Sequence, residues 1–478
     1  MTRFVLPAAA LAAIAAVNAC SLGPAYRRPY VDVPPAYAAT EATAASAWPS
    51  GHWWEGFGSP ELDDLIEQAR AANQNLAAAA ARIVQADAQV SINGAPLLPA
   101  VNGAGTYNYT REGTGTAGGG AAGYPGLRTS RYYDFRSYAA QLQVSYDLDF
   151  WGRNRALFRS AQAAALATRF DQETVALDTV TSVANTYFQL LDAQDRLGVA
   201  ERNLRSAESI LAAYRARLAA GTASALDVAQ QEALTAGVRA TIPSFRNQAE
   251  QERIALGILT GQPPERLRVA GGSLDPLHLP PVNPGLPSQL LARRPDVAYA
   301  EANLIAQNGN VQAARAAFFP DVTLTGAGGV QSAALSAITG PGTLIAQITA
   351  SLVQPIFDNG LRQGEYQQAR GRFEELAADY RQSVLQAFTD VETALAALRF
   401  TTEQEQLERD AARVAQRSAD IAQAQLQAGT IDIITQLNTQ ATLFNDLDLL
   451  AQVRLARFQA LLNLYKALGG GWALDGSA

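Results

Sequence analysis

The sequence predicts an α+β membrane protein built from a tandem internal repeat, with a few strands that cross a membrane and long helices that extend away from it. Two observations lead to this prediction. One passage, with a fixed order of motifs, occurs twice in the 478 residues with the same spacing. Beyond an N-terminal apolar stretch, no run approaches the 18 apolar residues of a membrane helix, whereas four short segments alternate apolar and polar residues.

The repeat sets the size of the longest helices. Each copy begins with a motif of apolar residues and a proline, which is followed by a Gly-rich stretch. A second motif ends this stretch, and a helical run then leads to a Gly-Thr pair. The three landmarks are 97–101, 149–152 and Gly221-Thr222 in the first copy, and 318–322, 357–360 and Gly429-Thr430 in the second. Gly152 to Gly221 and Gly360 to Gly429 both cover 69 positions. At about 1.5 Å per residue each run is a rod of roughly 100 Å, which indicates a device that spans a distance.

The N-terminus is typical of an export signal. Arg3 precedes an apolar stretch from Phe4 to Val17, which is too short to span a bilayer but suits a signal peptide. Cys20, the only cysteine, follows directly, so no intramolecular disulfide can form. This arrangement resembles bacterial lipoproteins, in which the cysteine is lipidated and becomes the first residue, although Asn18 departs from the usual small residue. We expect a signal peptide at 1–19 and a lipidated segment at 20–59, with a buried thiol as the alternative.

Four segments have the alternation of outer-membrane strands. They lie at about 100–110, 138–149, 321–330 and 344–354, and each pair encloses a Gly-rich loop. Period-two alternation over about ten residues is the signature of a strand with one face in lipid. The alternative is two ordinary hairpins of a soluble sandwich.

Four strands cannot close a barrel, because the smallest bacterial barrels need about eight. An open sheet in lipid would leave unpaired backbone groups at its edges. If these strands cross a membrane, several chains must therefore share one barrel.

The remaining segments are predicted to be helical. The long helices cover 153–220 and 361–428, and shorter helices return from the Gly-Thr turns at 226–259 and 433–468. A helix at 60–93 precedes the first strand pair, and its counterpart lies at 287–319. The repeats are thus 60–259 and 287–468, joined by a Pro-rich linker at 260–286 and followed by a tail at 469–478.

The residues give no indication of an active site. His52, His278 and Cys20 are too few for a His/Cys metal site. Gly326, Gly328 and Gly329 resemble the start of a dinucleotide-binding loop, but Gln331 stands where that motif needs its last glycine. No Gly-rich run carries a phosphate-binding lysine. The net charge of −7 and pI near 5.1 do not favour nucleic acid as a partner. We predict that the chain is not an enzyme and binds no cofactor and no metal. The only non-protein group that we expect is a covalent lipid on Cys20.

Four motifs resemble a known family in order and spacing. They begin at Cys20-Ser21-Leu22-Gly23-Pro24 and at Trp53-Trp54, continue with Arg293-Arg294-Pro295-Asp296-Val297, and end at Asn463-Leu464-Tyr465 before Gly469-Gly470-Gly471-Trp472. The chain resembles the outer membrane factor (TolC-like) family, the lipidated outer-membrane efflux channels of the OprM/NodT type. The resemblance covers essentially the whole mature chain.

The resemblance implies a homotrimer with a 12-stranded outer-membrane β-barrel, four strands per chain, continuous with a periplasmic α-helical barrel. It implies a lipid-anchored exit duct for drugs or other small molecules in a tripartite efflux system. The partners would be a periplasmic adaptor protein, an inner-membrane RND transporter and outer-membrane lipid. Two alternatives are a duct for type I protein secretion and a periplasmic coiled-coil scaffold or adhesin without a pore.

The two Gly-Thr turns are expected to form a periplasmic tip that docks the adaptor protein. The glycines end their helices as C-cap residues, and the returning helices start directly afterwards. The candidate docking residues are Leu218, Gly221 and Thr222 in the first copy and Leu426, Gly429 and Thr430 in the second. A plain helical hairpin without a partner is the alternative.

Asp227 matches a family motif whose aspartate helps to hold the periplasmic end of the tunnel shut. Three copies around an axis would form a ring of negative charge that favours cations. In the second copy Thr435 and Asn438 stand where relatives often carry carboxylates, and Leu426 and Ile431 replace polar gate residues. We therefore expect a closed state held mainly by packing, with Asp227 as the main gate acid and Asp432 as a possible addition. Alternatively Asp227 only caps its helix.

Overall fold

Two compact units make up the part of the chain that the structure describes. A computed structural model describes residues 26–37, 48–114, 131–282, 285 and 287–472. One unit contains the strands and is formed mainly by residues 85–165 and 303–376; the other contains 28–84, 166–302 and the residues from 377 onward. Each unit draws on both copies of the repeat, so neither copy folds as a separate domain. No helix among the described residues has the length and apolar character needed to cross a membrane.

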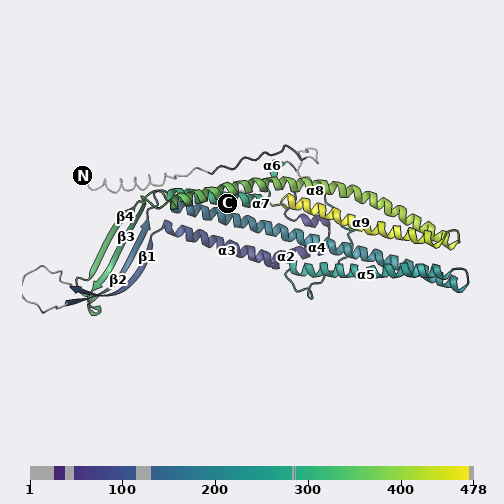
Figure 1. Cartoon of the computed structure of the whole chain (residues 1–478), viewed down its shortest axis with the longest axis horizontal. Helices are drawn as coiled ribbons and strands as arrows, with labels where there is room; N and C mark the ends of the chain where they lie inside the picture. Colours follow the sequence, from purple (N-terminus) through teal and green to yellow (C-terminus); the bar gives the residue numbers. More distant parts are fainter. Residues whose placement is uncertain (1–25, 38–47, 115–130, 283–284, 286, 473–478) are drawn as a thin grey trace, which may run out of the picture. The chain divides into compact units, whose positions relative to one another are not determined.

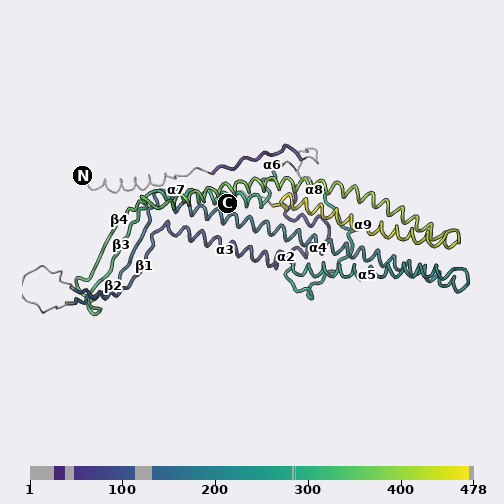
Figure 2. The backbone as a smooth tube through the Cα atoms, viewed as in Figure 1, coloured from purple at the N-terminus to yellow at the C-terminus, as the bar shows by residue number. Residues whose placement is uncertain are grey.

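The long helices of the two copies have equal length, as predicted. Helix α4 (Arg153–Ala219) and helix α8 (Leu361–Gln427) each have 67 residues. Helix α5 (Ala225–Leu259) and helix α9 (Ile433–Ala467) each have 35. In the second unit, α4 with α5 and α8 with α9 form two antiparallel hairpins whose turns lie at the same end (Figure 1). The smooth trace in Figure 2 shows the two chain reversals most clearly.

The predicted single helices at 60–93 and 287–319 are each interrupted. The first is split into α2 (Pro60–Ala72) and α3 (Gln74–Gly94) at Asn73, whose Oδ1 accepts the backbone N–H of Asn75 at 2.8 Å. The Nδ2 of Asn73 donates to the carbonyl oxygen of Leu259 at 2.8 Å, so the break is fixed by the end of α5. The second is split into α6 (Pro287–Leu290) and α7 (Pro295–Ala316), because the residue before a proline disfavours helical geometry. Short 3-10 helices occur at Trp53–Phe57, Ala95–Leu97 and Leu335–Ala337.

The first unit contains a single antiparallel sheet in the order β1-β2-β3-β4. Its strands are β1 (Ala100–Thr114), β2 (Arg131–Asp147), β3 (Asp321–Ser332) and β4 (Leu344–Val353). The predicted strands are therefore confirmed, but β1 and β2 extend into the segment that was predicted to be a loop. Among the described residues, strands β1 and β4 each pair on one side only, so the sheet has two open edges.

Aspartates fix the joints between strands and long helices. Asp149 has a left-handed backbone (φ 41°), and its two carboxylate oxygens accept the N–H groups of Asn154 and Arg155, both at 3.0 Å. Asp358 accepts the N–H of Gly360 at 3.0 Å at the start of α8. The orphan amides at each helix start are thereby satisfied, which explains the polar residue in both closing motifs.

An aromatic core holds the second unit together where α2, α4 and α9 meet the N-terminal segment. Trp53 stacks on Tyr465 with ring centroids 4.6 Å apart, and Phe57 meets Phe188 edge-on at 5.0 Å. Leu267 and Leu274 of the linker are buried in the same cluster. The linker is therefore part of the core rather than a free connection.

Candidate functional site

The sheet has one apolar face and one polar face. The register places Val101 opposite Val144, Leu142 opposite Gly328, and Gly326 opposite Ile348, so these side chains share a face. The apolar face is formed by Val101, Leu142, Val144, Val322, Leu324, Val330, Leu344, Ala346, Ile348, Ala350 and Leu352. The polar face carries Asn102, Gln141, Gln143, Thr323, Thr325, Gln347, Thr349 and Ser351. Ile348 is 83% exposed and Leu344 79%, so none of the residues that the structure describes covers these side chains of the apolar face.

Aromatic side chains lie at both ends of the strands. Tyr107 and Tyr138 are cross-strand neighbours with ring centroids 4.8 Å apart toward the β1–β2 hairpin end. At the helix end Trp151 stacks on Phe319 at 4.8 Å, and its indole N–H donates to the carbonyl oxygen of Pro320. Phe357, also at the helix end, is 85% exposed. Aromatic rows flanking an apolar band are typical of a sheet that crosses a membrane. The soluble sandwich is not supported, since the described residues form one sheet.

Both helical turns have the same backbone geometry. Gly221 has φ +73° and Gly429 φ +74°. The N–H of Thr222 donates to the carbonyl of Arg217 at 2.8 Å, and that of Thr430 to the carbonyl of Gln425 at 2.9 Å. This is the Schellman arrangement, which needs a residue that tolerates positive φ. The predicted C-cap role of both glycines is therefore confirmed.

The helices that return from the turns are capped differently. Ser224 and Asp227 form a capping box: the Ser224 hydroxyl accepts the Asp227 N–H at 3.1 Å, and the Asp227 carboxylate accepts the Ser224 N–H at 2.8 Å. In the second copy Asp432 is itself the cap and accepts the Thr435 N–H at 2.8 Å. The backbone and hydroxyl of Thr435 hold the pKa of the Asp432 carboxyl below its ordinary value. The capping reading of Asp227 is confirmed, whereas its gating role stays a prediction.

A tip cluster joins the two turns. It consists of Ile210, Leu211, Tyr214, Val228, Leu426 and Ile433, with Ala223 and Ile431 packed against it. Leu426 is buried in this cluster, while Leu218 is 38% exposed and Gly221, Thr222, Gly429 and Thr430 lie at the surface. Thr435 and Asn438 are exposed on α9. The tip cluster therefore packs the two hairpins together within one chain, and a closed gate held by packing stays a prediction.

Tyr214 is a tip residue that the sequence did not single out. Burial raises the pKa of its hydroxyl, Arg217 opposes that effect, and the charges of Asp227 and Asp432 raise the pKa further. Tyr214 shares the tip cluster with Val228 and Ile433, the residues that directly follow the two candidate gate acids. Its position within the helical repeat was the only available signal, since Tyr214 occupies a buried position on α4.

Two buried ionic clusters were also not predicted. Arg294, 8% exposed, binds Asp296 through two nitrogens and donates to Asp390 of α8 at 2.9 Å. Glu405, 3% exposed, accepts from Arg409 at 2.7 Å and from Arg457 at 2.8 Å, with Arg454 at 3.4 Å. Although burial by itself raises the pKa of Glu405, the hydrogen bond from Arg457 and the three positive charges lower it below its usual value. Both clusters hold helices together.

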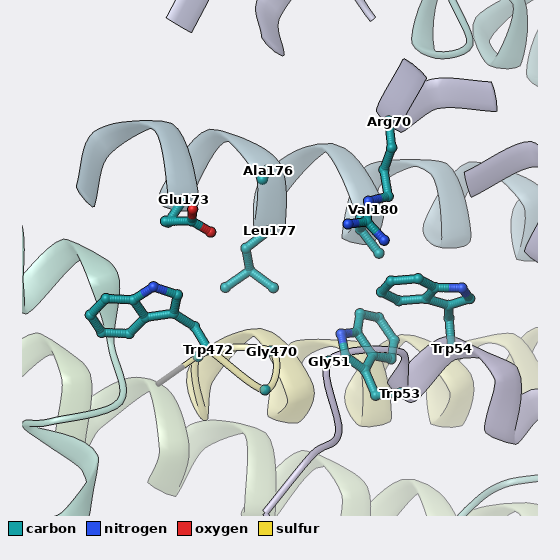
Figure 3. A pocket seen from close by; sticks show the side chains of 12 residues that line it. Gly51, Trp53, Trp54, Arg70, Glu173, Ala176, Leu177, Val180, Gly470 and Trp472 are labelled. Atoms are coloured by element: carbon teal, nitrogen blue, oxygen red, sulfur yellow. The ribbon is translucent and has the colours of Figure 1, made fainter. Parts of the chain in front are cut away.

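A cavity of about 370 Å³ lies beside the aromatic core (Figure 3). Trp54, Arg70, Glu173 and Trp472 line it; the Arg70 guanidinium lies 5.6 Å from the Trp54 ring centre. Burial raises the pKa of Glu173, and Arg70 partly offsets this effect. The only cysteine, the predicted lipidation site Cys20, lies outside the described residues.

The chain matches the family model described as outer membrane efflux protein over residues 65–262 and 286–470. It is 40% identical to the pyoverdine export outer membrane protein OpmQ of Pseudomonas aeruginosa, over 88% of both chains. It is 33% identical to the probable efflux pump outer membrane protein TtgC of Pseudomonas putida, over 99% of this chain and 96% of the relative. Identity to the cation efflux system protein CusC of Escherichia coli is 30%, over 96% and 97%.

Solved structures match over nearly the whole chain. The outer-membrane channel OprN superposes with a TM-score of 0.87 at 26% identity, covering 95% of this chain and all of the other. The open state of the MtrE outer membrane channel of Neisseria gonorrhoeae gives a TM-score of 0.83 at 28% identity, covering 96% and 100%.

Proposed function

This chain belongs to the outer membrane efflux protein family, and we propose that three copies of it form the outer-membrane exit duct of a tripartite, RND-type efflux system. The observation that carries the proposal is the sheet with one uncovered apolar face, one polar face and two open edges. Pairing β1 of one copy with β4 of the next would give 12 strands and leave no edge in lipid. The polar face would then line a water-filled lumen.

Small molecules are the cargo class that the relatives favour. The names of similar proteins refer to pyoverdine, cations, antibiotics and toluene. This observation favours efflux over type I protein secretion. A scaffold or adhesin without a pore would have no use for an uncovered apolar sheet face. A periplasmic adaptor and an inner-membrane transporter would complete the assembly and select the cargo.

Planar-bilayer conductance of the purified full-length protein tests the duct. We expect a trimer in detergent and discrete single-channel openings after insertion. A monomer, or a trimer that inserts without conducting, would contradict the proposal.

Lipidation of Cys20 is a separate part of the proposal, supported by the export signal that precedes it. Cys20→Ala should abolish acylation while leaving fold and trimer intact, because the strands already anchor the protein. Mass spectrometry of the wild-type N-terminus provides the measurement. An unmodified Cys20 or a retained signal peptide would refute it.

We also propose that the exposed residues of both turns dock the adaptor: Gly221, Thr222, Gly429 and Thr430, with Leu218 beside them. The buried Leu426 would support this surface from below. Asp227 and Asp432 would act at the gate in addition to capping their helices, beside the tip cluster that contains Tyr214.

A further inference from the structure

The apolar face of the sheet ends in a group of arginines and tyrosines at the β1–β2 hairpin. Beyond the Tyr107–Tyr138 pair, the register places Tyr109 opposite Arg136, Arg111 opposite Asp134, and Gly113 opposite Tyr132. Because side chains two positions apart share a face, all of them lie on the same side as Val101 and Leu142. We call Tyr109, Arg111, Tyr132, Asp134 and Arg136 the arginine cluster.

The arginine cluster lies beyond the four-stranded part of the sheet. The last residue of β3 that pairs with β2 is Ser332, opposite Tyr138. The cluster is therefore on a two-stranded extension, and its side chains lie at the second, fourth and sixth residue pairs past the tyrosine row (Figure 1). In a sheet that crosses a membrane, tyrosine rows mark the level where hydrocarbon gives way to headgroups. At about 3.4 Å per residue, the cluster thus begins roughly 7 Å past the tyrosine row, at headgroup level, on the side that faces lipid.

Contacts within the cluster hold the two guanidinium groups in place. Arg111 lies 4.8 Å from the Tyr132 ring centre, and Arg136 lies 5.9 Å from that of Tyr109. Asp134 Oδ1 accepts the Tyr109 hydroxyl at 2.9 Å and lies 3.3 Å from Arg111 Nε. The single carboxylate of the cluster therefore pairs with Arg111, and Arg136 has no ion pair within the described ranges. The cluster keeps one net positive charge with guanidinium N–H groups available.

Stacked guanidinium groups are well suited to phosphate. A planar fork of donors binds phosphate through two hydrogen bonds, and stacking on tyrosine reduces the side-chain entropy lost on binding. An apolar face adjoins the cluster, so a ligand with both phosphate and acyl chains would contact both surfaces. We propose that the arginine cluster binds the headgroup phosphate of a glycolipid of the outer leaflet, with its acyl chains along Leu142 and Ile348. This inference rests on the proposed function, in which the sheet spans the outer membrane with its hairpins outward.

The test measures binding of bisphosphorylated lipid A to the purified full-length trimer in detergent. Dephosphorylated lipid A with the same acyl chains is the reference ligand. We expect roughly tenfold tighter binding of the phosphorylated form, since two charge-assisted hydrogen bonds are at stake. The double variant Arg111→Gln/Arg136→Gln should lose this preference and bind both lipids alike. Arg153→Gln, which removes an exposed arginine at the opposite end of the strands, is the matched control and should keep it.

Equal binding of the two lipids by the wild-type trimer would overturn the inference. So would a phosphate preference that survives the double variant, or one that Arg153→Gln removes equally. Bilayer conductance of the same preparations separates this inference from the proposed function. A conducting trimer without phosphate preference refutes only the lipid site, whereas an absence of conductance refutes the duct itself.

Discussion

The two helical hairpins of the second unit have the same dimensions but are held together differently. In the α4–α5 hairpin, three exposed ion pairs link the helices at intervals of seven residues. They are Glu201–Arg246, Glu208–Arg239 and Arg215–Glu232. Seven-residue spacing on both helices is the signature of an antiparallel coiled coil whose flanking positions carry opposite charges.

The α8–α9 hairpin lacks this series. The equivalent positions, 208 residues later, pair Arg409 with Arg454, Gln416 with Leu447, and Gln423 with Gln440. The like-charged first pair is bridged by the buried Glu405. Between Glu405 and the turn, no ion pair joins α8 to α9 in the described residues.

The difference shows which properties of the duplicated hairpin are fixed by geometry. Equal helix lengths place the two turns side by side, and both turns need glycine at positive φ. Exposed ion pairs contribute little each, so they can differ without changing the shape. The second hairpin concentrates its charge in one buried group and leaves its tip to packing and polar contacts.

Adding a side chain at either turn should have the largest effect. Asparagine tolerates positive φ, so Gly221→Asn and Gly429→Asn should preserve both turns. The new side chains would extend into open space, because no atom lies within 4 Å of the added Cβ. We expect stable trimers and abolished efflux, measured as resistance of cells carrying the pump. Gly237→Asn adds the same side chain to open space on α5, roughly four turns from the tip, and should be neutral. Unchanged resistance would refute docking, and an effect at only one turn would show that the hairpins are not equivalent.

Removing the buried carboxylate should give the largest loss of stability. Glu405→Gln leaves Arg409, Arg454 and Arg457 without their shared counter-charge, which costs about 3–5 kcal/mol. The exposed-pair variant Glu201→Gln should cost at most about 1 kcal/mol. Thermal denaturation of the two trimers compares them. Similar losses of stability in the two variants would contradict the prediction that the buried carboxylate stabilises its hairpin more than an exposed ion pair does.

The link between the hairpins should depend on pH. Asp192 of α4 is 1% exposed and lies 3.8 Å from Arg196, which binds Asp448 of α9. Burial raises the pKa of Asp192 to about 6, despite Arg196. The folded state therefore holds this proton more tightly than the unfolded state, so stability falls by up to about 3 kcal/mol as pH rises from 4 to above 6. Asp192→Asn should gain thermal stability over wild type at pH 7.5 but not at pH 4.5; a pH-independent difference would contradict this.

Removing the capping aspartates should have the smallest effect, a change in conductance and ion selectivity that differs between Asp227 and Asp432. Asp227→Ala should raise single-channel conductance and weaken cation selectivity, because it removes a carboxylate from each copy at the gate. Asp432→Ala should have a smaller effect in the same direction. Bilayer recordings with a salt gradient measure both quantities. Asp227 serves only as a cap if Asp227→Ala changes neither conductance nor cation selectivity and lowers the stability of the trimer as much as Ser224→Ala does, by about 1 kcal/mol.

Local rules accounted for most of the fold. Helix length, the glycine turns and the strand alternation depend on residues close in sequence, and all were predicted correctly. The break at Asn73 was missed because it depends on a contact with Leu259, far along the chain. Arg294 and Glu405 were missed for the same reason, since their partners come from distant helices.

The tip was partly predictable. Asp227 was found through its family motif, and its cap through the turn that precedes it. Ser224 lies only three residues before Asp227, so the capping box depends on local sequence and is predictable from it. Tyr214 could not be assigned, because its proximity to Asp432 depends on how the two hairpins pack.

The three glycines near the C-terminus have a consequence for how the chain matures. Gly469, Gly470 and Gly471 all have positive φ and lie against Arg293, Leu177 and Ser50, where no side chain would fit. Residues far apart in the sequence, from position 50 to position 471, therefore meet in this unit. The core of this unit cannot be completed until residue 471 has left the ribosome, long after the first helices have been synthesised. Such a chain remains incompletely folded during synthesis, a state compatible with export as an extended polypeptide.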